Sequence, residues 1–103
     1  MNAFIRFKRA LTEESPLVST YHEAKWAELS DYQIPIHASL NLQESVHIRF
    51  VALLRRLQKA DFERTFTSPT HGLMSLEMAL QRFIWHNRHH MAQITSLKER
   101  MDW

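Results

Sequence analysis

The segment WHNRHH at residues 85–90 contains the side chains with the clearest capacity for chemistry. His86 and His90 are four positions apart, so on a helix their imidazoles lie one turn apart on the same face. With this spacing a helix can offer two nitrogen ligands to one divalent ion, at about 2.0–2.1 Å from each nitrogen for zinc. The sequence therefore predicts His86 and His90 as metal ligands.

The spacing alone leaves a structural alternative open. Seven histidines in 103 residues should give about half of one such pair by chance, so a solvated or core-satisfied pair is an equal interpretation. The helical phase favours the metal. The apolar stripe of this helix consists of Leu76, Leu80, Phe83, Ile94, Leu97 and Met101. His90 falls near its middle and His86 near its edge, so we expect both rings to point toward the core, where a metal ion would satisfy them.

Three neighbours receive weaker predictions. His89 is further round the helix, and we expect it to support the two ligands or to lie on the surface. Trp85 faces the opposite way with Arg88, which indicates either a dimer contact or packing under a connecting segment. His47 lies beside an apolar stripe of another helix; a core histidine is the favoured interpretation, although its side chain could approach the His86/His90 face.

The surrounding pattern predicts helices that would position these residues. Apolar residues at helical spacing predict helices over residues 2–11 and 43–59, and Ser75 is a suitable N-cap for a last helix that reaches about Arg100. Residues 17–42 read as a long crossover segment, with a short helix within 21–29 and an irregular stretch at 34–36. Residues 68–72 form a turn. The fold class is all-α, an incomplete four-helix bundle of three main helices plus the crossover segment.

Composition restricts the remaining possibilities. A chain of 103 residues forms one domain, and the absence of Cys excludes thiolate ligands and disulfides. The net charge is only +2 with basic residues scattered, which argues against nucleic acid as a partner. No stretch approaches the roughly 20 apolar residues of a membrane span, and the N-terminus lacks a signal-peptide core. We therefore expect no membrane partner and a cytoplasmic location.

Three blocks of the sequence carry a family resemblance. IRFKRALTEESP, YHEAKWAEL and FIWHNRHHMAQITSLKERM, followed by a terminal aromatic, occur in the order found in the DinB-like superfamily. The chain resembles most its YfiT-like branch of metal-dependent hydrolases, which is linked with bacillithiol S-transferases. The resemblance implies a four-helix bundle that holds a divalent ion (Zn, Ni or Mn) with three histidines, two of which correspond to His86 and His90.

The resemblance also implies what this chain lacks. The third histidine of the family and its first helix precede the position of Met1, in agreement with an uncapped first helix. Residues 1–103 are thus expected to be the C-terminal portion of one DinB-like domain. Gln93 stands where many relatives have a further His, and Ser68-Pro69 replaces a His-Pro. His47 and Arg49 match positions that are occupied similarly in close relatives.

The expected function follows from the open positions on such an ion. The resemblance favours transfer of a small-molecule thiol to an electrophilic substrate, and metal-dependent hydrolysis is a second possibility. The chain is expected to form a homodimer, which could cover the apolar faces left by the absent helix. The alternative is a non-catalytic helical dimerisation module or an inactive fragment.

Overall fold

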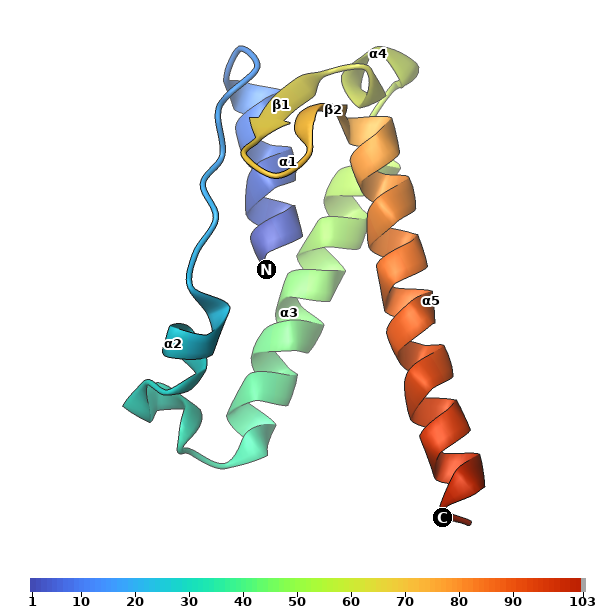
Figure 1. Cartoon of the computed structure of the whole chain (residues 1–103). Helices are drawn as coiled ribbons and strands as arrows, with labels where there is room; N and C mark the ends of the chain where they lie inside the picture. The colour runs from blue at the N-terminus through green and yellow to red at the C-terminus, as the bar shows by residue number, and fades with distance from the viewer. Residues whose placement is uncertain (103) are drawn as a thin grey trace.

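The structure, a computed structural model, describes residues 1–102, and Trp103, the terminal aromatic of the resemblance, lies outside the described residues. Three main helices and a small hairpin make up the fold (Figure 1). In chain order the elements are α1 (Asn2–Thr12), α2 (Glu23–Ala27), the 3-10 turn η1 (Ser30–Tyr32), α3 (Ile36–Arg55), α4 (Lys59–Phe62), β1 (Thr65–Ser68), β2 (Gly72–Ser75) and α5 (Leu76–Arg100). The predicted all-α class with three main helices and a crossover segment is confirmed.

The hairpin closes one end of the molecule, where the start of the crossover segment pairs with it. Strands β1 and β2 pair antiparallel, with Phe66 opposite Met74. Gly72 opens β2 at a φ of +72°, a conformation that glycine adopts without steric cost. Leu17 adds a parallel bridge to Thr67. The sequence predicted only the turn at 68–72, because strands of four residues are at the lower limit of length at which alternation indicates a strand.

Arg64 joins α1 to this hairpin end. Its Nε donates to the carbonyl oxygen of Ala10 at 2.7 Å, and its Nη2 donates to the carbonyl oxygen of Glu13 at 3.2 Å. The last carbonyls of a helix have no partner within the helix, and a guanidinium is well suited to satisfy them. The arginine therefore fixes the end of α1 beside β1.

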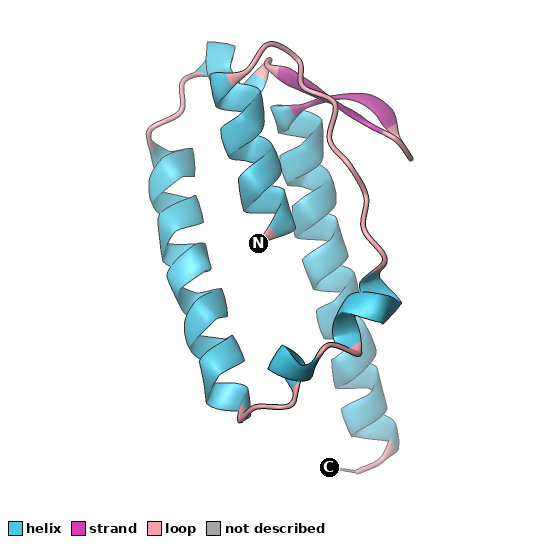
Figure 2. Cartoon of the chain, turned by 90° about the vertical axis from the view of Figure 1, so that its left-hand side faces the viewer, coloured by secondary structure: helices cyan, strands magenta, loops and turns pink. Residues whose placement is uncertain are grey.

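The hydrophobic core lies at the hairpin end of the three helices. Its buried residues are Phe7, Ala10, Val18, Phe50, Phe66, Met74 and Leu76. Figures 1 and 2 show α1 beside only the part of α3 and α5 that is near the hairpin. Beyond α1 the two long helices continue without that cover, and every residue from 84 to 102 is exposed.

The helix boundaries differ from the prediction mainly in α3. This helix begins at Ile36 and ends at Arg55, whereas the sequence predicted 43–59. Pro35 precedes the first turn with a φ of −55°, which suits a helix start, so the proline did not keep the segment irregular. At the other end, Gln58 and Asp61 form a capping box that starts α4, and the chain breaks between the two helices.

The first, short and last helices agree more closely with the prediction. Helix α1 spans Asn2–Thr12 against a predicted 2–11, and α2 spans Glu23–Ala27 within the predicted 21–29. Ser75 caps α5, because its Oγ accepts from the amide of Met78 at 3.2 Å. None of the helices in residues 1–102 combines the length and apolar character that a membrane crossing requires.

Candidate metal centre

Helix α5 brings His86 and His90 into direct contact. Their Nε2 atoms are 2.9 Å apart, with the ring centroids 4.3 Å apart and the ring planes at 86°. At this distance one ring donates a hydrogen bond to the other. The i, i+4 spacing therefore produces the convergence of two imidazole nitrogens that the sequence predicted.

The separation of these nitrogens fits a shared ion. Two nitrogens about 2.0–2.1 Å from one ion lie roughly 2.9 Å apart at a right angle and roughly 3.3 Å apart at the tetrahedral angle. The observed 2.9 Å is thus within a side-chain adjustment of either geometry. Both rings are exposed, so an ion could reach them from solvent.

The expectation that the two rings point into the core is wrong for the described chain. His86 and His90 are exposed, and the core side of α5 ends at Phe83, whose ring lies 5.6 Å from that of Phe50. The apolar stripe continues past this point in sequence, but α1 does not extend along it (Figure 2). Helical phase gives the face of a residue and cannot tell whether another element covers that face.

Trp85 and His89 form a separate pair on α5. Their rings are stacked, with centroids 5.0 Å apart and planes at 8°. Trp85 is 64% exposed, so it is not buried under the crossover segment, and the predicted dimer contact is untested by a single chain. His89 is exposed, so the prediction that it lies on the surface is confirmed.

The structure does not bring a third histidine to the pair. His47 is exposed on α3, and residues 1–102 contain no group of three His, Asp or Glu side chains close enough to hold one ion. The described residues therefore supply two candidate ligands, and their assignment to a metal stays a prediction.

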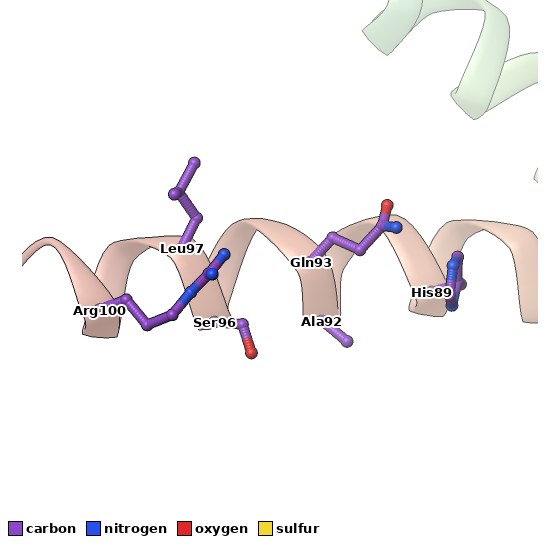
Figure 3. Close-up of a pocket in the computed structure, with 6 residues that line it drawn as sticks. All are labelled: His89, Ala92, Gln93, Ser96, Leu97 and Arg100. Atoms are coloured by element: carbon purple, nitrogen blue, oxygen red, sulfur yellow. The ribbon is translucent and has the colours of Figure 1, made fainter.

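Of the two departures from the family pattern, Ser68 lies away from the pair and Gln93 lies next to it on α5. Ser68 is buried at the end of β1, where its hydroxyl is 3.1 Å from that of Thr70. Figure 3 shows Gln93 on the same side of α5 as Leu97, with Ala92 and Ser96 on the opposite side. Gln93 is exposed and three residues after His90, so it lies about one turn beyond the pair on the same face of the helix.

An open cleft of about 1390 Å³ borders His86. Its floor includes the buried side chains of Phe7, Phe66 and Met74. Its other residues come from α1, the crossover segment, the hairpin and α5. Sequence reasoning missed this cleft, since its walls are far apart in the chain and no local pattern links them.

Three basic side chains of the cleft were also missed. Arg6 and Arg82 line it together with His71, whose Nδ1 is 3.2 Å from Nη1 of Arg82. No sequence pattern assigned a role to either arginine. The hint in the sequence was that Arg82 is four positions before His86, hence one turn away on the same helix face.

Comparison with known proteins places the chain in a family. The profile of the DinB superfamily matches residues 2–94. Proteins from Oceanobacillus iheyensis and Bacillus mycoides, 50% and 48% identical over all 103 residues, carry the provisional name of metal-dependent hydrolase. This chain covers 60% of the length of each.

A solved structure gives the same relationship. YfiT from Bacillus subtilis is 45% identical and superposes with a TM-score of 0.88, covering 100% of this chain and 60% of that protein. It is described as "a probable metal-dependent hydrolase with an unusual four-helix bundle topology". The family resemblance and the helical-bundle fold are therefore confirmed, and the chain belongs to the DinB superfamily.

Proposed function

We propose that this chain binds a divalent metal ion through His86 and His90 and carries the metal site of an enzyme that activates a nucleophile. The observation that supports the proposal most strongly is the 2.9 Å separation of the two Nε2 atoms. Relatives named as metal-dependent hydrolases support the metal requirement. A site with two protein ligands has further positions for water or substrate, as catalytic sites require.

The donor set indicates which ions to expect. Imidazole suits zinc and nickel, whereas manganese prefers carboxylate and other oxygen ligands. The described residues offer two imidazoles and no cluster that includes a carboxylate. Of Zn, Ni and Mn, we therefore propose zinc or nickel.

Two reactions fit such a site, and we propose thiol transfer as the first. A bound divalent ion would stabilise a thiolate or lower the pKa of water. In thiol transfer the sulfur of a small-molecule thiol forms a bond to an electrophilic carbon, the leaving group departs with its electron pair, and the thiol proton passes to solvent. In hydrolysis, water replaces the thiol. Both reactions use the same two histidines.

A paired assay tests the proposal. The chain, stripped of metal and then supplied with Zn²⁺ or Ni²⁺, is incubated with cysteine as the thiol and 1-chloro-2,4-dinitrobenzene as the electrophile, and thioether formation is followed by absorbance. A parallel reaction with p-nitrophenyl acetate and no thiol reports hydrolysis. We expect metal-dependent turnover in one reaction, and its loss in His86→Ala and His90→Ala but not in the matched control His89→Ala.

The control variants decide the outcome. Turnover that needs no metal, or that survives equally in all three variants, would contradict the proposal. Thioether formation alone identifies a transferase, and ester cleavage alone identifies a hydrolase.

A second candidate function is helix-mediated dimerisation. Met91, Ile94, Leu97 and Met101 are 63%, 63%, 42% and 53% exposed along α5, and contiguous apolar surface of this kind commonly marks an interface. We propose that two copies associate through this face. Sedimentation velocity should give a concentration-dependent dimer that Ile94→Glu dissociates. A monomer at every concentration, or a dimer unaffected by Ile94→Glu, would exclude this interface.

A further inference from the structure

The cleft beside His86 contains two guanidinium groups without a carboxylate partner. Arg6 on α1 and Arg82 on α5 both line the cleft. In residues 1–102 the ion pair is that of Arg9 with Glu13, and neither Arg6 nor Arg82 takes part in it. Glu23 also lines the cleft, but it forms no ion pair with either arginine in the described chain. Two cations at an apolar-floored cleft leave a net positive site.

The hydrogen bonding of these arginines is incomplete. The Nε of Arg6 is buried and has no hydrogen-bond partner, and its Nη2 reaches only the carbonyl oxygen of Ser19 at 3.4 Å. Nη1 of Arg82 lies 3.2 Å from Nδ1 of His71. A guanidinium presents five donors in a planar fork that matches carboxylate and phosphate oxygens. Both side chains therefore have donors available for an anion.

Aromatic rings also line this cleft. Tyr21, Trp26 and Tyr32 of the crossover segment line it, and the rings of Tyr21 and Trp26 lie 4.9 Å apart. Such rings cover the apolar part of a ligand, while a few polar groups fix its orientation. The cleft thus suits a small molecule with an anionic end and an apolar body.

We propose that Arg6 and Arg82 bind the anionic group, a carboxylate or a phosphate, of the small molecule on which the His86/His90 site acts. The assignment of this molecule as substrate rests on the proposed function, whereas the anion subsite itself does not. Because His86 borders the cleft, an anionic end held at the arginines directs the rest of the molecule toward the histidine pair. His71 contacts Arg82 and keeps its guanidinium in position.

Nuclear magnetic resonance can test the subsite without a metal. The Nε–H signals of the arginines are followed in EDTA during titration with sodium malonate or with inorganic phosphate, at ionic strength matched with sodium chloride. We expect saturable shifts of the Arg6 and Arg82 signals with at least one of the two anions. The anion that binds more tightly distinguishes a carboxylate subsite from a phosphate subsite.

Three variants make the test specific. Arg82→Gln and Arg6→Gln should each weaken the binding about tenfold, the loss expected for a charge-assisted hydrogen bond. The matched control Arg88→Gln, on the same helix but outside the cleft lining, should bind like the wild type. Arg82 and Arg88 are both exposed, so neither substitution should prevent folding, and thermal unfolding verifies this for Arg6→Gln.

The outcomes separate this proposal from the metal proposal. Equal affinity in Arg82→Gln, Arg88→Gln and the wild type, or no saturable shift with either anion, overturns the anion subsite whatever the metal does. His90 does not line the cleft, so His90→Ala should bind metal at least about tenfold more weakly and keep anion binding. If the wild type binds malonate or phosphate but no metal, the subsite stands and the proposed enzyme function fails.

Discussion

The ring of Phe50 on α3 lies edge-on against the ring of Phe7 on α1, with 5.0 Å between centroids and 65° between planes. Phe50 also contacts Phe4 on α1 and Phe83 on α5, each with centroids 5.6 Å apart. A single side chain therefore links all three main helices. Aromatic pairs at these distances add to the free energy gained from burying their surface. The position of α5, and with it the histidine pair, depends on this contact.

Truncating the central ring should loosen the whole fold. We expect Phe50→Ala to lower the free energy of unfolding by about 3–5 kcal/mol, the usual cost of removing a buried phenyl ring. Urea denaturation followed by circular dichroism measures the loss. Ile48→Ala is the control, because Ile48 is on the same helix but 61% exposed, and it should change stability by less than about 1 kcal/mol. Equal losses in the two variants would mean that Phe50 does not hold the core together.

The start of α5 should depend on its serine cap. Ser75→Ala removes the hydroxyl that accepts from the Met78 amide, and we expect a loss of about 1 kcal/mol in thermal or urea unfolding. Ser96→Ala is the matched control, since Ser96 is exposed within α5 and alanine is a better helix former there. A Ser75→Ala protein as stable as Ser96→Ala would show that the cap contributes nothing.

Arg64, which donates to carbonyl oxygens at the end of α1, should stabilise that end of the helix locally. Arg64→Ala removes two hydrogen bonds to main-chain carbonyls, and we expect a loss of about 1–2 kcal/mol, with faster hydrogen exchange in the last turn of α1. Arg56→Ala serves as control, because Arg56 is also exposed and is outside that contact. Exchange rates in α1 that are identical in both variants would contradict this role.

The sequence predicted the helices better than the cleft and the contacts between them. Ser75 and the helical spacing of apolar residues within 2–11 are local signals, and the helices they indicate exist within a few residues. The contact of His86 with His90 follows from one turn of helix, so it was predictable as well. Both depend on residues that are close in the chain.

What could not be predicted depends on residues far apart in sequence. The cleft of Arg6 and Arg82 joins α1 to α5, and no pattern within either helix reveals that they meet. The exposure of His90 depends on which part of α5 lies beside α1 (Figure 2), and the phase of α5 does not contain this information. Leu17 from the crossover segment bridges to Thr67 of β1, and this contact too joins segments that are far apart in the chain.

One ion pair should make a small part of the stability depend on pH. Arg9 donates to both carboxylate oxygens of Glu13, at 2.9 and 3.1 Å, and this hydrogen bonding lowers the pKa of Glu13 below its ordinary value. A lowered pKa in the folded state stabilises the fold above the unfolded-state pKa, and this contribution is lost as the pH falls through the folded-state pKa. Wild type should therefore be slightly more stable than Glu13→Gln at neutral pH and should lose that advantage in acid. An advantage that persists at pH 2 would disprove the ion-pair explanation.

Zinc binding at the proposed metal site is the property that can be measured most directly. Isothermal titration of the metal-free chain with Zn²⁺ should show one ion per His86/His90 pair, with affinity at least about tenfold weaker in His86→Ala and in His90→Ala, since each variant leaves a single imidazole. His89→Ala, whose ring stacks on Trp85 instead of joining the pair, should bind zinc like the wild type. Zinc binding that is absent from the wild type, or equally strong in all three variants, would contradict the account.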